Sequence, residues 1–312
     1  MPKIAILNST KALDYESNRI IEEFDKLQIP VVPLNVAKTI VKFNAPQITV
    51  QMPDYQQNLH NLKEFDGFIV RQVFSVMKLT INVVRWVKHS LKRPIFDNNL
   101  VQSQYLVNKV TEGFEALQYN LPYPKTLYFT DLDMLFANTE FIEQYLNAYP
   151  MVVKHLSKGK GYGVFKMDSR QELIEFFQEL AQTHHKKEKA VRLYLLQEFL
   201  HIDKEFRVLV LNNKVIGAMQ RIPQAGDFRA NYSRGGTVKP ATVTPAMQKL
   251  ALKAVQASNV VFSGVDYAIT KDGKHILLEV NRTPGFEGFE QATGINVAKI
   301  FVDYLRESWG WA

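Results

Sequence analysis

The chain has 312 residues, a net charge of +7, 46% hydrophobic and 22% charged residues, and no cysteine. This length and composition are ordinary for a globular protein with two or three lobes, and the lack of cysteine excludes disulfides, thiolate zinc sites and a cysteine nucleophile. The first apolar run is too short for a signal peptide, and no run approaches the roughly 20 residues of a membrane-spanning helix. We therefore expect a cytoplasmic protein without a membrane partner.

The basic residues are scattered among acidic ones, and the densest basic cluster, residues 184–189, is typical of a solvated helix end or loop. This arrangement argues against nucleic acid as a partner. A positive net charge also concentrates anions around a protein, so an acidic substrate fits the composition.

In the first third of the chain, short apolar runs alternate with amphipathic stretches. The apolar residues Ile20, Ile21, Phe24 and Leu27 recur with a helical period. We expect strands over residues 3–7, 31–34, 67–70 and 94–96, and helices over residues 16–27 and 80–89. This alternation predicts a mostly parallel sheet covered by helices, whereas residues 38–61 are polar, only weakly periodic and receive no assignment.

The rest of the chain mixes helices with strands that follow one another directly. We expect helices over residues 102–118, 131–146, 170–182 and 245–258, and from residue 296 onward. Strands are expected over residues 125–129, 151–154, 164–167, 194–198, 205–211, 214–222, 264–270 and 275–280. The predicted fold class is therefore a combination of α/β and α+β.

A loop rich in glycine and lysine joins the strands of residues 151–154 and 164–167. It contains Lys158, Gly159, Lys160, Gly161 and Gly163. Glycines let backbone N–H groups approach phosphate oxygens, and lysines neutralise their charge. The pattern matches neither common phosphate-binding signature, and a glycine-rich hairpin turn made soluble by lysine is the alternative. Lys154 favours the phosphate interpretation, because it ends a strand and can point under the loop.

A second polar cluster lies in the predicted hairpin of residues 264–280. Asp272-Gly273 is typical of a two-residue turn of the I′ type, which places residues whose numbers sum to 545 opposite each other. Asp266 then faces Glu279, and Asn281 shares the face of Glu279 because side chains alternate along a strand. Opposed like charges destabilise a hairpin, and Mg²⁺ or Mn²⁺ removes the conflict by taking oxygen ligands. A solvated pair of acids is the alternative.

An arginine-rich segment follows the strand of residues 214–222. It contains Arg221, Asp227, Arg229, Asn231 and Arg234, next to two glycines. Arginine binds carboxylate and phosphate groups at two points, so this segment suits contact with an anionic ligand. A plain surface loop is the alternative.

Together these segments resemble the ATP-grasp superfamily, and within it the RimK-like glutamate ligases. The matching segments are VK at residues 153–154, KGKGYGV at 158–164, LQEFL at 196–200, EFR at 205–207, DFRANYSRGG at 227–236, GVD at 264–266 and LEVNRTPGFEG at 278–288. They follow the expected order over about residues 96–312, and residues 1–95 match only in their α/β character. The resemblance implies an ATP-grasp fold with three domains: an N-terminal parallel-sheet (pre-ATP-grasp) domain over residues 1–97, a small lobe with the glycine loop over residues 98–196, and a C-terminal lobe with the metal site over residues 197–312.

The resemblance also implies roles for single residues. Phosphate contacts with ATP fall to Lys109, Lys154, Lys158, Gly159, Lys160 and Gly161. Gln197 and Glu198 would lie at the hinge and bind the adenine amino group, with the backbone of Phe199 and Leu200 along the ring edge. Glu205, where family members often carry aspartate, would bind the ribose. Two magnesium ions, replaceable by manganese, would be held by Asp266, Glu279 and Asn281, and the transferred phosphoryl group would face Arg207, Arg229 and Asn231.

The activity that these roles imply is ADP-forming ligation of a carboxylate to an amine. The carboxylate attacks the γ-phosphate of ATP, and the amine then displaces phosphate from the acyl phosphate, so the enzyme needs no nucleophilic side chain. We expect an amino acid such as glutamate to be added to a peptide or small acidic acceptor. Two alternatives stay open, an ATP-grasp ligase of cofactor or natural-product biosynthesis and a nucleotide-binding regulatory protein without ligase activity. The sequence also leaves homo-oligomer formation open.

Overall fold

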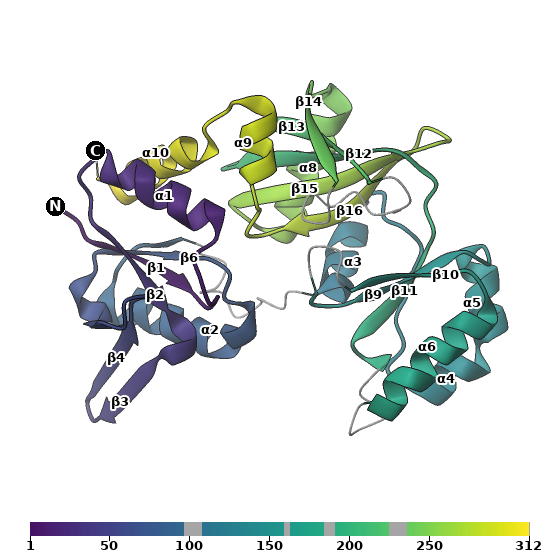
Figure 1. The fold of residues 1–312 in the computed structure, drawn as a ribbon, viewed down its shortest axis with the longest axis horizontal. Helices are drawn as coiled ribbons and strands as arrows, with labels where there is room; N and C mark the ends of the chain where they lie inside the picture. Colours follow the sequence, from purple (N-terminus) through teal and green to yellow (C-terminus); the bar gives the residue numbers. More distant parts are fainter. Residues whose placement is uncertain (97–107, 159–162, 184–190, 225–235, 312) are drawn as a thin grey trace. The chain divides into compact units, whose positions relative to one another are not determined.

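The computed structural model of the chain describes residues 1–96, 108–158, 163–183, 191–224 and 236–311 (Figure 1). Its contacts divide the chain into two compact units, one made of Met1–Tyr105 with Thr283–Ala312 and the other of Leu106–Arg282. The three domain ranges expected from the sequence stay a prediction. No helix in the described part of the chain is both long and apolar enough to span a bilayer.

The first unit contains the expected parallel sheet. Its strand order is β2 (Val31–Asn35), β1 (Ile4–Asn8), β6 (Gly67–Val70) and β7 (Ile95–Phe96), and every neighbouring pair is parallel. One face of this sheet buries Ala5, Leu7, Phe68 and Val70 in a core shared with helix α2 (Met77–Trp86), which contributes Val83 and Val84, and with Val87 directly after it. The prediction from the alternating pattern is confirmed for these strands.

Residues 38–61, which had no assignment, form a small antiparallel sheet of β3 (Ile40–Asn44), β4 (Gln47–Pro53) and β5 (Leu59–Asn61). Phe43 is 79% exposed and Ile40 45% exposed. Because β3 buries little on either face, its sequence lacks the alternation that marks a half-buried strand. Short turns of 3-10 or π helix complete the N-terminal segment, at Val36–Lys38, Leu62–Glu64, Phe74–Val76 and Val87–Leu91.

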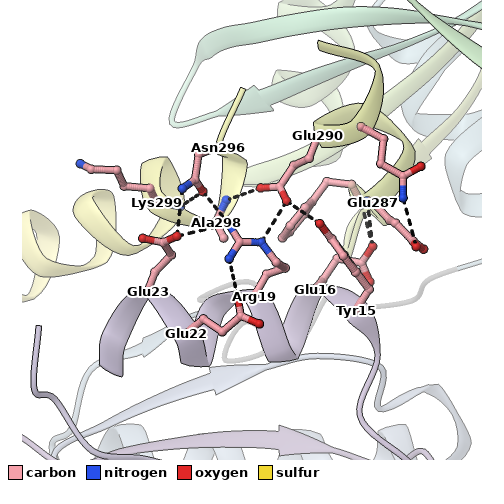
Figure 2. Close-up of polar contacts among 12 residues, drawn as sticks. Tyr15, Glu16, Arg19, Glu22, Glu23, Glu287, Glu290, Asn296, Ala298 and Lys299 are labelled. Carbon is pink, nitrogen blue, oxygen red and sulfur yellow. Dashed lines mark hydrogen bonds and ion pairs between the residues drawn. The ribbon is translucent and has the colours of Figure 1, made fainter. Parts of the chain in front are cut away.

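The C-terminal residues of the first unit pack on helix α1 (Tyr15–Asp25) through α9 (Glu287–Thr293) and α10 (Val297–Trp309) (Figure 2). Arg19 donates to Glu290 (3.2 Å) and Asn296 (3.1 Å), and the hydroxyl of Tyr15 donates to Glu290 (2.9 Å). Helix α10 was expected from residue 296. Helix α9 was missed because it is short and its start is held by α1, far away in the sequence.

The second unit begins with helix α3 (Lys109–Gln118) and a sheet in the order β10 (Val164–Met167), β9 (Met151–His155), β11 (Tyr194–Glu198) and β8 (Thr126–Leu127). Helices α4 (Leu132–Ala137), α5 (Thr139–Leu146) and α6 (Arg170–Thr183) pack on one face of that sheet. A single helix over residues 131–146 was wrong: Asn138 leaves the helical conformation and its side chain donates to Met134 O (2.7 Å), which ends α4.

A five-stranded antiparallel sheet completes the second unit. Its order is β14 (Thr237–Ala241), β13 (Lys214–Ile222), β12 (Ile202–Leu211), β15 (Phe262–Thr270) and β16 (His275–Asn281). Helices α8 (Pro245–Ser258) and α3 cover one face and bury Phe206, Val208, Val265 and Tyr267. Since side chains alternate along a strand, the intervening residues are presented on the opposite face.

Candidate active site

The hairpin of β15 and β16 is closed by a different turn from the expected one. Thr270 N donates to Lys274 O and Gly273 N donates to Thr270 O, each at 2.9 Å. The loop thus has three residues, and Gly273 (φ +81°), but not Asp272, adopts a left-handed conformation. A three-residue loop of this kind is a type I turn followed by a glycine bulge, so the predicted I′ turn was wrong.

The expected facing of Asp266 and Glu279 is nevertheless confirmed. Next to the turn the pairs are offset by one residue, as in Ala268 with Ile276, and a bulge at Leu278 then restores the expected register. Asp266 therefore pairs with Glu279, and Gly264 pairs with Asn281. The two one-residue shifts cancel, which is why a wrong turn led to the correct pair.

Polar side chains in adjacent strands cross the face of the five-stranded sheet that lies opposite α3 and α8. They are Arg221 on β13, Glu205 and Arg207 on β12, Asp266 on β15, and Glu279 and Asn281 on β16. These are the positions that alternate with the apolar residues under α3 and α8. The sheet therefore collects two arginines, three acids and one amide in a single row.

Asp266 is the centre of this row and is only 4% exposed. Its oxygens accept two hydrogen bonds from Arg207 (2.7 Å each), one from Arg221 (2.8 Å) and one from Asn281 Nδ2 (3.0 Å). Although burial opposes ionisation, Arg207 and Arg221 hold the pKa of Asp266 below its usual range. The two guanidinium groups therefore neutralise a buried carboxylate that the sequence marked as a metal ligand.

Asn281 faces Asp266 through its amide nitrogen. Its Nδ2 group donates to Asp266 and, at 3.4 Å, to Gly264 O; since both are acceptors, the amide oxygen Oδ1 must point away from them. Two carboxylates and one amide oxygen are ligands that Mg²⁺ accepts, so the residues fit the ion. The described residues contain no group of three acidic or histidine side chains that could hold a metal, so this site depends on the amide.

Lys109 and Lys154 reach the same region from α3 and β9. Lys109 Nζ lies 3.4 Å from Glu279, and although burial opposes its charge, Glu279 and Glu112 raise its pKa. Burial lowers the pKa of Lys154 to about 8, and Lys109 adds to this shift. Lys154 lies on β9 beside Val153, whose side chain packs on the helices, so it extends from the other face of that sheet.

Glu112 and Arg221 also belong to this cluster: Glu112 was not noted from the sequence, and Arg221 was noted only as part of the arginine-rich segment, without a role of its own. Glu112 accepts a hydrogen bond from Val280 N (3.1 Å), which fixes the edge strand β16 between Glu279 and Asn281. Burial raises the pKa of Glu112 to about 8, and Glu279 adds to the shift. Arg221 bridges Glu205 (3.0 Å) and Asp266 (2.8 Å). A weak signal existed for Glu112, which lies one helical turn after Lys109.

At the end of β11 the chain passes from the four-stranded to the five-stranded sheet. The side chain of Gln197 donates to Thr126 (2.9 Å), and that of Glu198 accepts from Lys125 N (2.8 Å) and Asn147 (3.2 Å). Phe199 and Leu200 then form the short link to β12, in which Leu200 O accepts from Ile202 N (3.0 Å). These four residues thus lie at a connection between two sheets, and their expected contacts with adenine stay a prediction.

The base of the glycine loop is held by His155. Its Nδ1 accepts from the backbone N–H groups of Ser157 (3.1 Å) and Lys158 (3.2 Å). Burial, together with Lys158 and Lys109, lowers the pKa of His155, so the ring is neutral and Nδ1 stays an acceptor. Gly159, Lys160, Gly161, Arg229 and Asn231 lie outside the described residues.

Gly163 closes this turn and leaves no room for a side chain. A Cβ atom at this position would lie 2.6 Å from the His155 Cβ and 2.9 Å from the Lys158 Cβ. We expect Gly163→Ala to displace Lys158 and weaken ATP binding by about tenfold or more, the range for losing one hydrogen bond to a charged group. Isothermal titration with a non-hydrolysable ATP analogue measures this effect. Gly113→Ala is the matched control, since the nearest atom there is 3.4 Å away; equal affinities of the two variants would contradict the prediction.

Comparison with known proteins agrees with this arrangement. A family described as the RimK-like ATP-grasp domain matches residues 117–305. A probable alpha-L-glutamate ligase of Pseudoalteromonas translucida is 28% identical over 98% of this chain and 96% of its own length. A ribosomal protein bS6–L-glutamate ligase of Salmonella paratyphi B is 35% identical over 50% of this chain and 50% of its own length.

Solved structures share the fold at low sequence identity. The macrocyclase MdnC of Microcystis aeruginosa, bound with the precursor peptide MdnA, has a TM-score of 0.69 at 16% identity and covers 97% of this chain and 99% of its own. A RimK domain protein of Sphaerobacter thermophilus has a TM-score of 0.67 at 18% identity, covering 97% and 98%. Because the family match spans more than half of the residues, the chain belongs to the RimK-like ATP-grasp family and is an ATP-dependent carboxylate–amine ligase.

Proposed function

We propose that this enzyme adds an amino acid, glutamate, to a carboxylate of a peptide or small acidic acceptor through an acyl phosphate, with ADP as the nucleotide product. The observation that carries the proposal is the row of charged side chains across β12, β13, β15 and β16, faced by Lys109 and Lys154. This row supplies both cations for phosphate and oxygen ligands for a divalent ion.

The lysines hold the phosphates of ATP in this proposal. Lys109 comes from α3, Lys154 from β9 and Lys158 from the loop that follows β9. We expect Gly159, Lys160 and Gly161 of the same loop to add backbone donors. Arg207, with Arg221 beside it and Arg229 farther along the chain, neutralises charge on the transferred phosphoryl group, and Asn231 faces the same group as a neutral hydrogen-bond donor. Such preorganised cations lower the barrier because they need not reorganise during the reaction.

The divalent ion site consists of Asp266, Glu279 and Asn281. Magnesium bound there, with two ions as our expectation, would neutralise phosphate charge and align the attacking and leaving oxygens. Glu112 supports the site by fixing Val280 N. The nucleotide base would lie along residues 197–200. Because the side chains of Gln197 and Glu198 already bind Thr126 and Lys125 N, the base would contact the backbone. Glu205 would bind the ribose.

Two findings support glutamate and an acidic or peptide acceptor. The relative that aligns over nearly the whole chain is named a probable alpha-L-glutamate ligase, and the solved neighbour MdnC is bound with a precursor peptide. The net charge of +7 also suits an anionic acceptor.

Mass spectrometry of complete reactions tests the proposal. Reactions contain ATP, magnesium, a glutamate-ended peptide and each amino acid singly, and the nucleotide product is separated in parallel. We expect the peptide to gain one glutamate residue as ADP forms. AMP would contradict the acyl phosphate, and a peptide that only loses water would indicate internal amide formation in place of amino acid addition. ADP without any amide product would reject the amino acid assignment and leave the ATP site standing.

Lys154 is half-buried, and we expect its charge to lower the stability of the fold while it supports ATP binding. Its folded-state pKa of about 8 lies below the ordinary lysine value of 10.5, so its charge destabilises the fold below about pH 8, and this penalty fades as the pH rises from 8 to 10.5. We expect Lys154→Met to be more stable than wild type at pH 7, by a margin that shrinks toward pH 10. Its affinity for ATP should fall about 10- to 100-fold, as expected for a lost hydrogen bond to a charged group.

Thermal unfolding at pH 7 to 10 and titration with ATP measure the two effects. Lys158→Met is the matched control, because Lys158 is exposed and should change ATP affinity without raising stability. Wild-type affinity for ATP should itself decline above pH 8, when Lys154 loses its proton. A less stable Lys154→Met protein at pH 7 would contradict the burial argument.

A further inference from the structure

A second polar site lies in the first unit, at the carboxyl ends of strands β1 and β6. The sheet order β2-β1-β6-β7 places β2 on one side of β1 and β6 on the other, so the direction of winding reverses between β1 and β6. Ligands of open parallel sheets bind beyond the strand ends at such a reversal. Asn8 ends β1, and Arg71 follows β6 with its N–H donating to Leu7 O (2.9 Å), which brings the two residues side by side.

Both side chains bury a hydrogen-bond donor that has no acceptor among the described residues. Asn8 is 0% and Arg71 3% exposed, and the donors in question are Asn8 Nδ2 and Arg71 Nε. The orientation of the Asn8 amide is fixed, because Oδ1 accepts from Thr10 N (2.8 Å) and the Thr10 hydroxyl (2.6 Å). Buried donors are normally satisfied, so two adjacent exceptions indicate an acceptor that the chain itself does not provide.

The two acids next to Arg71 form only long contacts with its guanidinium group. Asp14 lies 3.4 Å and Glu16 3.9 Å from Arg71 Nη2, longer than the roughly 2.7–2.9 Å of a strong guanidinium–carboxylate bond. Both acids have other partners: Asp14 caps α1 by accepting from Ser17 N (3.0 Å), and Glu16 (Figure 2) accepts from the N–H groups of Phe286 (2.8 Å) and Glu287 (3.3 Å). Arg71 therefore keeps donor capacity for an anion.

The chemistry of the site selects the kind of anion. Asn8 Nδ2 and Arg71 Nε only donate, which requires an acceptor with lone pairs and, opposite a guanidinium, favours a negative charge. Asp14 and Glu16 within 4 Å of Arg71 disfavour a doubly charged phosphate, since like charges repel at this range. A singly charged carboxylate fits both conditions.

The strand end beside these donors is also strained. Gln72, directly after Arg71, has a left-handed backbone (φ +49°), and its carbonyl oxygen accepts from Ser9 N (3.3 Å) and the Ser9 hydroxyl (2.6 Å). Residues other than glycine adopt a left-handed backbone only at a cost in free energy, and such residues cluster at ligand sites. Gln72 thereby ties the segment after β6 to the segment after β1.

We propose that Asn8 and Arg71 bind a carboxylate group of one of the two ligation substrates, either the free amino acid or the acceptor peptide. This inference rests on the proposed function for the identity of the substrates, but the binding site itself does not depend on turnover. Asn8→Asp is the variant of choice, because it replaces the donating amide by a carboxylate of the same shape that Arg71 can neutralise, while it repels a carboxylate ligand.

Isothermal titration without catalysis tests the site. Wild type and variants are loaded with magnesium and a non-hydrolysable ATP analogue and titrated with glutamate and, separately, with a glutamate-ended tripeptide. We expect Asn8→Asp to weaken binding of one of them by at least about tenfold through the lost charge-assisted pair, and the ligand affected identifies the source of the carboxylate. Arg71→Lys, which keeps the charge but removes the Nε donor, should weaken binding of the same ligand.

Asn35→Asp is the matched control, because Asn35 ends the neighbouring strand β2 and its Oδ1 only caps Ala37 N (3.0 Å). It should bind both ligands like wild type, and all variants should keep their affinity for the ATP analogue. Three results would overturn the proposal. The first is that Asn8→Asp binds both ligands like wild type, and the second is that wild type binds neither ligand. The third is that Asn35→Asp loses the same ligand affinity, or that Asn8→Asp also loses affinity for the ATP analogue. Normal binding with no amide product in turnover assays would instead refute the proposed function and retain this site.

Discussion

Glu279→Gln should lower ATP turnover by at least about 100-fold, the usual effect of removing one group that stabilises the transferred charge, and should leave the fold intact. The carboxylate of Glu279 is 36% exposed and has the ammonium of Lys109 at 3.4 Å as its ion-pair partner. Replacing it by the amide removes the ion-pair partner of Lys109 but leaves Glu112 beside that lysine, while it removes one of the two acids of the proposed metal site.

Asp266→Asn should lose turnover to a similar extent and stability as well. Asp266 is 4% exposed and accepts from both Arg207 and Arg221. With a neutral amide in its place, the two guanidinium groups lose the carboxylate that they share, although Arg221 keeps Glu205 (3.0 Å), and breaking a buried pair in this way costs about 3–5 kcal/mol. The two acids of one site are thus expected to differ in their effect on folding.

Phosphate release at saturating magnesium and thermal unfolding followed by circular dichroism separate the two effects. Asp272→Asn, an exposed acid in the turn of the same hairpin, is the control and should change neither quantity appreciably. Near-normal turnover in both Glu279→Gln and Asp266→Asn would remove the metal assignment. Equal unfolding midpoints for the two variants would contradict the role of Asp266 as the counter-charge of the arginines.

The parts of the fold that could be predicted from the sequence are those in which one face of an element is buried. Strands β12, β13 and β15 alternate apolar and polar residues because α3 and α8 cover one side, and the same alternation placed Asp266 and Glu279 on the open side. Strand β3 escaped prediction because Phe43 and its neighbours are exposed. Helix α9 escaped because its first N–H groups bind Glu16, 270 residues away for Phe286.

The kinds of side chain in the candidate site could be predicted from the sequence, whereas most of their hydrogen-bond partners could not. Asp266 and Glu279 were expected from turn chemistry and Lys154 from its place before the glycine loop, whereas Lys109, Glu205 and Arg207 were expected only from the family resemblance. Nothing local in the sequence shows that Arg207 and Arg221 both bind Asp266. Glu112 was missed for the same reason, since its partner is the N–H group of Val280, 168 residues away. Partners that meet only through the tertiary fold leave no periodic pattern.

The arginine pair on Asp266 predicts that metal binding depends on nucleotide. In the structure both oxygens of Asp266 are occupied by Arg207, Arg221 and Asn281. A metal ion at Asp266 therefore competes with two guanidinium groups for the carboxylate, and the phosphates of ATP offer a displaced arginine an anionic partner. Without nucleotide no phosphate takes up that arginine, and the ion competes against a buried ion pair.

Titration with Mn²⁺ followed by electron paramagnetic resonance, in the absence of nucleotide, measures this competition without any turnover. We expect wild type to bind Mn²⁺ weakly and Arg207→Met to bind it at least about tenfold more tightly, because removing one partner of a buried charge pair leaves Asp266 undercompensated. Adding Glu279→Gln to the Arg207→Met variant should reverse the gain in Mn²⁺ affinity, because Glu279 then no longer contributes its charge to the ion. Lys299→Met is the control: it removes an exposed lysine of α10 and should leave Mn²⁺ affinity unchanged. Tight Mn²⁺ binding by nucleotide-free wild type would show that the arginines do not restrain Asp266, and unchanged weak binding in Arg207→Met would show that Arg221 alone is sufficient to exclude the ion.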